Sequence, residues 1–241
     1  MCTVTFVPTQ NGFVFASNRD EQPNRPTLAP DFYLHNTKVL LYPKDTVAGG
    51  TWLGLSSKQR LVCLLNGGDV YHNPRVKFPK SRGEVVRQAL LQTDINQALS
   101  GLALNQVAPF TLVVVDWNLE LSLKEWIWEK GVLTERRLDE TQSKIWSSST
   151  LYTSEEKELR KQWLQNINFS KHQEVFGNLL NFHQNETLGT TSIAPKMKRD
   201  MVQTVSTSII QKNEKGLQFD YYDYANGKQK RLANVFEPQN K

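Results

Sequence analysis

The fold is decided by the stretch CTVTFVPTQNGFVFASNRDE, which occupies residues 2–21. Its first residues alternate, so Cys2 and the apolar side chains after it are expected on one face of a strand, with two threonines on the other. Residues 8–12 supply turn chemistry and end in an Asn-Gly pair, which tolerates positive φ angles. Residues 13–17 return as a second strand, so the stretch predicts a β-hairpin.

The hairpin brings a polar run beside the N-terminus. If Pro8 and Gly12 are opposed across the turn, the residue numbers of cross-strand partners sum to about 20. Cys2 is therefore expected opposite Asn18, within one or two residues. The charged residues that follow Asn18 would then lie next to Cys2.

The remaining β segments are apolar or alternating runs between turn residues. They are expected near residues 39–42, 51–55, 60–65 and 110–116, in a meander of three short strands over 119–134, and near 203–210, 217–224 and 232–236. Residues 22–50 contain four of the ten prolines and are expected to be mostly irregular outside the short strand near 39–42.

Four helices are predicted from capping residues and helical periodicity. They are expected to begin at the capping-box spacing Ser81–Glu84, at Thr93 or Asp94, at Ser154, and near residue 170. The helix that begins at Ser154 would place Leu159, Trp163 and Leu164 on its apolar face. The order of strands, helices and strands predicts an α+β layered sheet rather than alternating βαβ units, in one domain over residues 1–241.

The composition describes an ordinary globular chain. Its 241 residues are 39% hydrophobic and 22% charged, which excludes disordered and fibrous classes. No run approaches the roughly 18 consecutive apolar residues of a membrane span, and the N-terminus lacks the features of a signal peptide, so we expect a cytoplasmic protein. The 29 basic and 24 acidic residues give a net charge of +5, which does not single out nucleic acid as a partner.

The sequence predicts neither a metal site nor a cofactor. Cys2 and Cys63 are too few for a disulfide framework, and they lack the Cys-x-x-Cys spacing of a metal site. The four histidines, at positions 35, 72, 172 and 183, are scattered without an i, i+4 pair. A zinc site would therefore need ligands that converge only in the folded chain.

Cys2 is the residue on which a functional interpretation depends. Methionine is normally removed when the next residue is as small as cysteine, which would leave Cys2 with a free α-amine. The pKa of such an amine is about 7.7–8.0, so the amine can act as the general base for the thiol of the same residue. Alternatively, Cys2 is only a small apolar residue in a strand.

Arg19 and Asp20 support the first interpretation of Cys2. A guanidinium near Cys2 would lower the pKa of the thiol, and a carboxylate could orient the α-amine or bind a substrate amine. The alternative for these two residues is an ion pair at the surface of the turn end, which contributes only ~0–1 kcal/mol.

Four motifs occur in the order typical of a known family. They are Met-Cys at the start, Ser17–Glu21 followed by Arg25-Pro26, the AGGTWLG run over residues 48–54, and a strand that ends in Asn66. Through these motifs the chain resembles the NRDE family, also called the transport and Golgi organisation 2 family. The motifs lie within the first seventy residues, and beyond them the resemblance is carried by length and element order.

That family is related to the N-terminal nucleophile (Ntn) hydrolases, in particular to cysteine members that resemble penicillin V acylase and bile salt hydrolase. The resemblance implies a four-layer αββα sandwich with the nucleophile at the start of the first strand. It assigns Cys2 as that nucleophile, and it assigns Arg19 and Asp20 to the arginine and aspartate after the second strand. The hydrolases space those two residues further apart, so Glu21 could take the acidic role instead of Asp20.

The resemblance also implies an oxyanion hole and a substrate site. Asn66, together with Gly67, matches the position of an oxyanion-hole donor. The residues expected to contact the substrate are Asn18, Glu21, Gly67 and Ser147. Two positions depart from the hydrolases, because Ser147 stands where they have an asparagine and Val205 where they have an arginine. Loss of an oxyanion donor can lower a rate by ~10²–10³.

Two functions stay open, and a third, nucleic-acid binding from the net charge of +5, has no recognised motif beside it. The first is a cysteine amidohydrolase that cleaves a non-peptide C–N amide bond of a small molecule through an acyl-thioester on Cys2. The second is a non-catalytic binding or trafficking protein that handles haem, acyl-CoA or lipid in the same cleft. Haem would need an axial ligand, for which Cys2, His172 and His183 are candidates. The substrate and the oligomeric state do not follow from the sequence.

Overall fold

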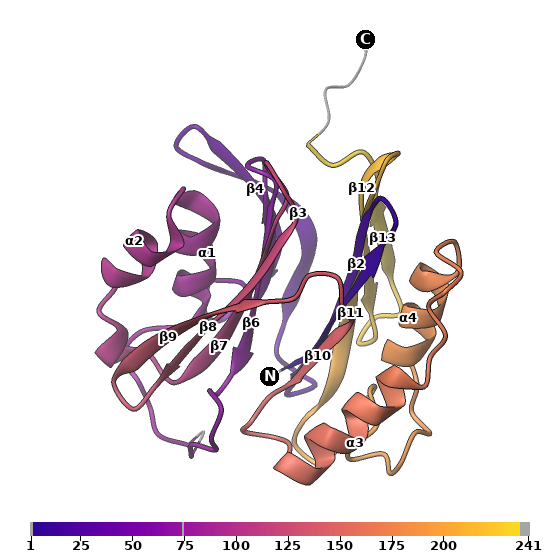
Figure 1. Cartoon of the computed structure of the whole chain (residues 1–241). Helices are drawn as coiled ribbons and strands as arrows, with labels where there is room; N and C mark the ends of the chain where they lie inside the picture. Colours follow the sequence, from indigo (N-terminus) through magenta and orange to yellow (C-terminus); the bar gives the residue numbers. More distant parts are fainter. Residues whose placement is uncertain (1, 74, 237–241) are drawn as a thin grey trace. The chain divides into compact units, whose positions relative to one another are not determined.

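The computed structural model describes residues 2–73 and 75–236, except for the side chain of Cys2. The chain divides into two compact units. The first unit contains residues up to 24, residues 141–147 and the chain from 152, and the second unit contains residues 25–140 and 148–151. Each unit is built on one antiparallel sheet with helices on one of its faces (Figure 1). In the described part of the chain, no helix is long and apolar enough to cross a membrane.

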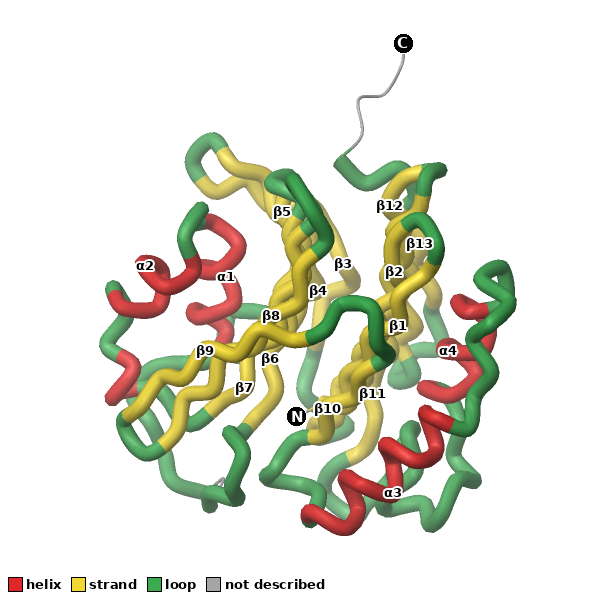
Figure 2. The backbone as a smooth tube through the Cα atoms, in the orientation of Figure 1, coloured by secondary structure: helices red, strands yellow, loops and turns green. Residues whose placement is uncertain are grey.

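The first unit contains a six-stranded sheet that includes the predicted hairpin. Its strand order is β10-β1-β2-β11-β12-β13, and all neighbours are antiparallel. Its elements are β1 (Cys2–Thr9), β2 (Gly12–Glu21), β10 (Lys144–Ser147), α3 (Ser154–Gln165), α4 (Val175–His183), β11 (Gln203–Asn213), β12 (Gly216–Asp223) and β13 (Gln229–Leu232). Figure 2 shows α3 and α4 on one side of these strands.

The register of the β1–β2 hairpin confirms the sequence prediction to within one residue, because Cys2 lies opposite Arg19. The turn requires a glycine at Gly12, where φ is +147° and an added Cβ would lie 2.1 Å from the carbonyl oxygen of Lys212. The second strand is longer than expected, since it continues as far as Glu21. The polar run of the sequence is therefore part of the sheet.

The core of the first unit lies between its sheet and its two helices. The apolar side chains of α4 recur with helical spacing at Val175, Leu179 and Phe182. They share a cluster with buried side chains of β1, β2 and β11, namely Val7, Val14, Ala16 and Ile209. Helix α3 begins at Ser154, as predicted, behind a complete capping box.

The second unit contains a seven-stranded sheet with the order β3-β4-β5-β6-β7-β8-β9. Its elements are β3 (Thr27–His35), β4 (Lys38–Asp45), β5 (Leu53–Ser56), β6 (Arg60–Asn66), α1 (Gly83–Leu91), α2 (Ile95–Ser100), a 3-10 turn (Leu104–Gln106), β7 (Phe110–Asp116), β8 (Ser122–Glu129) and β9 (Val132–Leu138). The apolar side of α1 shares a core cluster with Val62, Leu112 and Val114 of the sheet. Asp94, one of the two expected caps, accepts two backbone N–H groups at the start of α2.

Strand β3 is the main difference from the sequence prediction. The expectation of a mostly irregular segment over residues 22–50 is wrong, because β3 and β4 occupy most of it. β3 is an edge strand of its sheet, and Pro30 lies where the register shifts between Leu28 and Asp31. A proline at an irregularity in an edge strand interrupts little of the hydrogen-bond ladder, so it does not exclude a strand.

Three smaller predictions are also wrong. The last strand ends at Leu232 instead of beginning there. The meander over residues 119–134 consists of two long strands rather than three short ones. At the predicted capping box Ser81–Glu84, the glutamate accepts hydrogen bonds from side chains one turn later in the helix, so it is not available to cap the helix.

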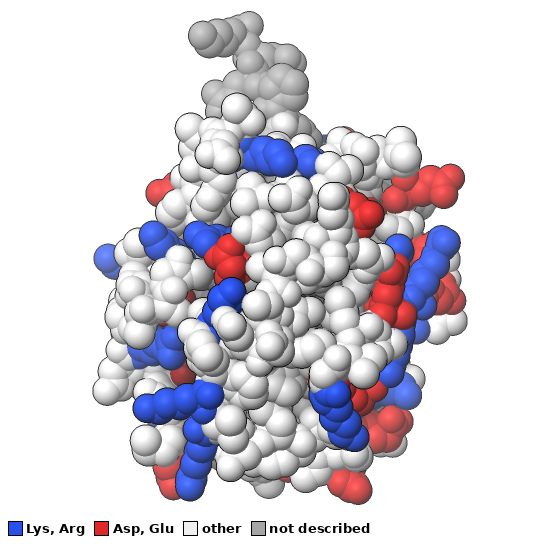
Figure 3. Space-filling view, turned by 90° about the vertical axis from the view of Figure 1, so that its left-hand side faces the viewer, with Lys and Arg blue, Asp and Glu red and all other residues white. Residues whose placement is uncertain are grey.

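Charged side chains are spread over the face of the molecule shown in Figure 3. Lysines and arginines are interspersed with acidic side chains around an uncharged centre, so the described residues of this face form no continuous basic patch. A protein that binds nucleic acid usually presents such a patch as its electrostatic footprint. The net charge of +5 is therefore not concentrated on this face.

Candidate active site

The start of β1 meets the end of β2 and the start of β11 in the first unit. Cys2 has Arg19 as its cross-strand partner, and Arg19 has Ser206 on its other side. Asp20 lies opposite Thr204, and the register of β11 shifts between Thr204 and Ser206. The hairpin therefore brings the predicted polar run beside Cys2. The irregularity in β11 lies opposite Arg19 and Asp20.

Arg19 and Asp20 point to opposite faces of the sheet, because they are successive residues of one strand. Asp20 shares with Asn18 the face that carries the helices, where Asn18 donates hydrogen bonds of 2.8 Å to the backbone carbonyls of His183 and Pro195. Arg19 and Asp20 are both buried, with exposed fractions of 3% and 0%. The alternative of a surface ion pair is therefore wrong.

The carboxyl group of Asp20 has one bonded and one unbonded oxygen. Oδ1 accepts a hydrogen bond of 2.7 Å from the hydroxyl of Thr204, whereas Oδ2 is buried without a hydrogen-bond partner among the described residues. Burial raises the pKa of Asp20 to about 6, although the hydrogen bond from Thr204 and the charges of Arg160 and Arg199 lower it. A carboxyl group with this pKa can exchange a proton near neutral pH.

Asn18 is the centre of a buried hydrogen-bond network. Its Oδ1 accepts hydrogen bonds from the hydroxyl of Thr207 at 2.7 Å and from Nδ1 of His183 at 3.0 Å. Together with the two bonds that Nδ2 donates to carbonyls, these contacts use every hydrogen-bonding group of the side chain. The geometry favours a structural role for Asn18 over the substrate contact expected from the sequence.

His183 is neutral in this network. Burial, together with the nearby charge of Arg160, lowers the pKa of His183 to about 3. Because Oδ1 of Asn18 can only accept, we assign the proton to Nδ1 of His183, so that Nε2 accepts from the hydroxyl of Thr5 at 2.8 Å. Both ring nitrogens are engaged, so His183 offers no free nitrogen to haem.

Arg160 is a site residue that the sequence does not predict. It lies on α3 and is fully buried, whereas Leu159, expected on the apolar face of this helix, is 37% exposed. The guanidinium of Arg160 stacks on the ring of Tyr152, with Cζ 4.2 Å from the ring centroid, and Cζ of Arg199 lies 5.3 Å from the same centroid. The available signal was its spacing of one helical turn from the buried Leu164.

Asn66 and Gly67 end strand β6 in the second unit. The carbonyl of Asn66 accepts a hydrogen bond of 2.6 Å from the hydroxyl of Ser148, and the hydroxyl of Thr111 donates to the carbonyl of Gly67 at 2.9 Å. Gly67 has a φ of +88°, and an added Cβ would lie 2.1 Å from Oγ of Ser149. The side-chain amide of Asn66 has no hydrogen-bond partner among the residues that the structure describes. The strand end is thus fixed through its backbone, and the amide is available to a ligand.

The two remaining predicted residues lie in the first unit. Ser147 is the last residue of β10, and its hydroxyl oxygen accepts a hydrogen bond of 3.0 Å from Nε of Arg160. Glu21 is the last residue of β2 and is partly exposed, and its carboxylate accepts a hydrogen bond from the backbone N–H of the next residue. Buried Asp20 is therefore a better candidate than Glu21 for the acid beside Cys2.

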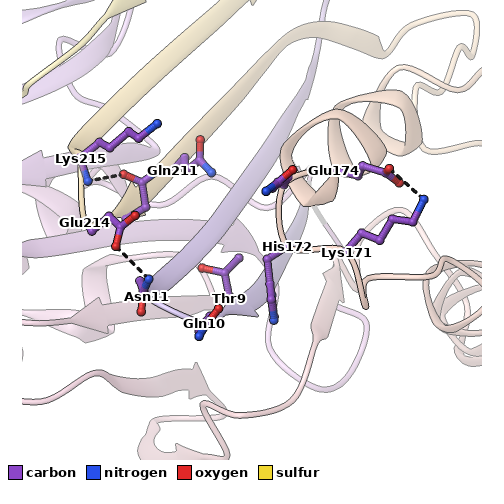
Figure 4. A pocket seen from close by; sticks show the side chains of 11 residues that line it. Thr9, Gln10, Asn11, Lys171, His172, Glu174, Gln211, Glu214 and Lys215 are labelled. Atoms are coloured by element: carbon purple, nitrogen blue, oxygen red, sulfur yellow. Dashed lines mark hydrogen bonds and ion pairs between the residues drawn. The ribbon is translucent and has the colours of Figure 1, made fainter.

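A polar cavity of about 660 Å³ lies at the other end of the hairpin strands from Cys2 (Figure 4). It is lined by the β1–β2 turn, the β11–β12 turn and the residues before α4, including His172. All its lining side chains are polar or charged, which does not suit an apolar haem ring. Among the residues that the structure describes, no group of three or more His, Cys, Asp or Glu could hold a metal ion.

The fold has solved counterparts. The C2A variant of the conjugated bile acid hydrolase from Clostridium perfringens matches with a TM-score of 0.57 and 12% sequence identity, over 99% of this chain and 93% of that chain. Penicillin V acylase from Agrobacterium tumefaciens matches with a TM-score of 0.57 and 10% identity, over 98% and 87% of the two chains. Identities this low show the fold alone. The two structural matches place the chain in the Ntn-hydrolase fold class, as predicted.

The chain belongs to the Transport and Golgi organisation 2 family, whose model matches residues 1–229. The Transport and Golgi organization protein 2 homolog of Bos taurus is 41% identical over 80 residues, and that of Homo sapiens is 36% identical over 86 residues. These alignments cover 32% and 34% of this chain, and 28% and 29% of the two relatives. The match to these relatives thus spans less than a third of their length. The family predicted from the sequence is confirmed by the family model.

Proposed function

We propose that the chain is an N-terminal-nucleophile cysteine amidohydrolase that cleaves a non-peptide C–N amide bond of a small molecule. The observation that carries the proposal is the position of Cys2 at the start of β1, with Arg19 opposite it and the buried carboxyl group of Asp20 beside Arg19. The reaction takes place in the cytoplasm, where a thiol stays reduced.

The proposed reaction begins when removal of Met1 frees the α-amine of Cys2. The amine takes the thiol proton, and the sulfur attacks the amide carbonyl carbon to give a tetrahedral oxyanion. When the C–N bond breaks, the α-ammonium gives its proton to the departing amine, and an acyl-thioester remains on Cys2. Water then attacks the thioester carbonyl and passes a proton through the α-amine to the sulfur, which releases the acid and restores the thiol.

Five other residues have roles in this proposal. The guanidinium of Arg19, across the hairpin from the nucleophile, favours the thiolate. Asp20 orients the α-ammonium through its carboxylate. The family resemblance assigns the oxyanion-hole donor to Asn66, whose side-chain amide is a group suited to this role. The same resemblance assigns substrate contacts to Gly67 and Ser147.

The names of the structural neighbours support this choice of chemistry. They are a conjugated bile acid hydrolase and a penicillin V acylase, so both names point to small-molecule substrates. The C2A variant also indicates that the first of these hydrolases has a cysteine at position 2. A small amide is therefore the substrate class that we propose for this chain.

Intact-mass spectrometry tests the proposal. We expect the native chain to lack Met1 and to gain one acetyl group at Cys2 during incubation with p-nitrophenyl acetate, an activated acyl donor. Cys2→Ala should abolish the adduct, and Cys63→Ala, which alters a cysteine buried in β6, should preserve it. Retention of Met1, or equal acetylation after Cys2→Ala, would contradict the proposal.

A second candidate function is the binding or transport of an acyl-CoA or lipid without catalysis. It is favoured by an apolar strip on the edge strand β3, where Phe32 and Leu34 are 48% and 72% exposed. We expect palmitoyl-CoA to bind in calorimetric titration and Phe32→Ser to weaken this binding. Val132→Ser, which alters an exposed apolar residue on the edge strand β9, should leave the binding unchanged.

Haem is a further ligand considered for this second candidate. Cys2 is the axial-ligand candidate that stays, because both ring nitrogens of His183 are hydrogen-bonded and the cavity that His172 lines is polar throughout. Titration with haemin, followed by Soret absorbance, should show a shifted band if Cys2 binds iron, and the shift should disappear in Cys2→Ala. No spectral change at micromolar haemin would exclude haem as the ligand.

A further inference from the structure

Arg160, on α3, is hydrogen-bonded to three other segments of the first unit. Its Nε donates to the hydroxyl of Ser147 at 3.0 Å, and Nη2 donates to the hydroxyl of Thr3. Nη1 donates to the backbone carbonyls of Ile193 and Ala194, the latter at 3.0 Å. A guanidinium without hydration needs such partners, and Arg160 is fully buried.

All these partners are neutral. Arg160 forms no ion pair with any carboxylate that the structure describes. Its flat face is covered by the ring of Tyr152, and burial raises the pKa of the Tyr152 hydroxyl, so this group is also uncharged. The positive charge of Arg160 is therefore not neutralised by a direct partner, and it acts on titratable groups around it.

The groups that experience this charge lie on the helix-facing side of the six-stranded sheet. Asp20 is the nearby carboxyl group, and it also experiences the charge of Arg199 from the segment before β11. His183 of α4 is held neutral by burial and by the charge of Arg160. Both arginines thus favour the ionised form of Asp20, and Arg160 is the one that also contacts β1.

We propose that Arg160 is the positioning residue of the Cys2 nucleophile, through its hydrogen bonds to Thr3 and to Ser147. Thr3 follows Cys2 directly and pairs with Ser147 across β1 and β10, so one guanidinium fixes both strands at this point. Arg160 acts through these residues and does not itself contact the substrate. The inference rests on the proposed function of Cys2.

Loss of the guanidinium should change the ionisation of the nucleophile. Without the positive charge, the pKa of Asp20 rises. The α-amine of Cys2 then has no carboxylate to orient it until a higher pH is reached. The thiolate is also less favoured when a nearby positive charge is removed. The pH at which Cys2 reaches half of its maximal reactivity should therefore rise.

The pH profile of Cys2 alkylation by iodoacetamide measures this change, because peptide mass spectrometry separates Cys2 from the buried Cys63. We expect the midpoint to rise by about one pH unit in Arg160→Met and to return most of the way in Arg160→Lys, which keeps the charge. The matched control is Arg60→Met, which removes another buried arginine, in the second unit. It should lose stability and keep the wild-type midpoint.

The outcomes separate the inference from the function on which it rests. An unchanged midpoint in folded Arg160→Met overturns the inference, and so does an equal shift in Arg60→Met, since loss of stability alone would then explain the shift. If Cys2 of the wild-type chain reacts no faster than free cysteine at any pH, the proposed function of Cys2 fails first.

Thr3→Val provides the test if Arg160→Met does not fold, as judged by circular dichroism. This variant removes one acceptor of Arg160 and leaves its charge in place. We expect alkylation of Cys2 to slow by about threefold at every pH, because the strand is held less firmly, with no change in the midpoint. A wild-type rate in Thr3→Val would overturn the role of Arg160 in positioning Cys2.

Discussion

The buried arginines Arg60 and Arg160 show that the two units use one residue type in different ways. Arg60 begins β6 and donates to the carboxylate of Asp116 at 2.6 Å, so its charge is paired. Its other donors bind backbone carbonyls at the end of α1, including those of Ala89 and Gln92. A positive charge is favourable at the C-terminus of a helix, so Arg60 stabilises the second unit.

Arg160 makes a similar number of hydrogen bonds but has no described carboxylate as a partner. Its charge instead changes the protonation of groups around it, Asp20 among them. Burial of an arginine is therefore not by itself a sign of function. The difference between the two residues lies in their partners, since a paired charge stabilises the fold and an unpaired one adjusts a site.

The largest expected effect belongs to Arg60. Arg60→Met leaves the carboxylate of Asp116 and several carbonyls at the end of α1 without partners, so we expect the free energy of unfolding to fall by about 3–4 kcal/mol. Urea denaturation measures the loss. The control is Lys161→Met, which breaks an exposed pair with Glu158 and should cost less than about 1 kcal/mol. Equal losses would break the comparison.

Gly67→Ala tests whether the end of β6 is as rigid as its contacts indicate. The new Cβ would meet Oγ of Ser149 at 2.1 Å, at a φ of +88°, so we expect a loss of about 2–3 kcal/mol. Gly131→Ala is the matched control, because Gly131 has a φ of +78° with nothing within 4 Å of an added Cβ. That control should cost only about 1 kcal/mol in the same denaturation experiment.

The pH dependence of stability should depend on the first unit. The folded pKa of His183 is about 3, below its ordinary 6.5. The contribution of neutral His183 to the free energy of unfolding is therefore complete above pH 6.5 and is lost as the pH falls toward 3. The folded pKa of Asp20 is about 6, above its ordinary 3.8. The contribution of protonated Asp20 to the free energy of unfolding is therefore complete below pH 3.8 and is lost as the pH rises through 6. The two contributions oppose each other between these limits.

Asp20→Asn should therefore reveal the contribution of His183. Between about pH 4 and 6, we expect the stability of this variant, relative to that of the wild type, to fall by about 1 kcal/mol for each unit of decreasing pH. Thermal unfolding across this pH range measures the difference. Parallel curves for the two proteins would show that Asp20 does not titrate as described.

The smallest expected effect concerns the bonded oxygen of Asp20. The hydrogen bond from Thr204 to Oδ1 lowers the pKa of the Asp20 carboxyl group. Thr204→Val removes this hydrogen bond, so we expect the pKa of Asp20 to rise by about one unit. Carbon-13 NMR of the carboxyl group measures the change. Thr111→Val, which removes a comparable hydrogen bond in the second unit, should leave this pKa unaltered.

The hairpin shows what a local pattern can predict. Alternation and an Asn-Gly turn placed Cys2 opposite the polar run to within one residue, because both strands and the turn lie within about twenty consecutive residues. Strand β3 was missed because Pro30, like the two prolines just before the strand, is typical of loops. Only the place of β3 at the edge of the sheet makes Pro30 acceptable.

The candidate site could be predicted only in part for the same reason. Cys2, Arg19 and Asp20 are brought together by the hairpin, so the sequence identified them. Arg160 is separated from its partner Thr3 by 157 positions, and no local pattern indicates such a contact. The sequence likewise could not predict that Asn18 is the centre of a buried hydrogen-bond network, because its partners come from elements near the other end of the chain.

The proposed mechanism depends most directly on the first residue of the native protein. Amine labelling of the purified, full-length chain, followed by peptide mass spectrometry, identifies the residue that carries the free α-amine. We predict a labelled α-amine on Cys2 and no peptide that retains Met1. A native protein in which Met1 is present and labelled would contradict the mechanism, because the amine of Cys2 would then be part of a peptide bond.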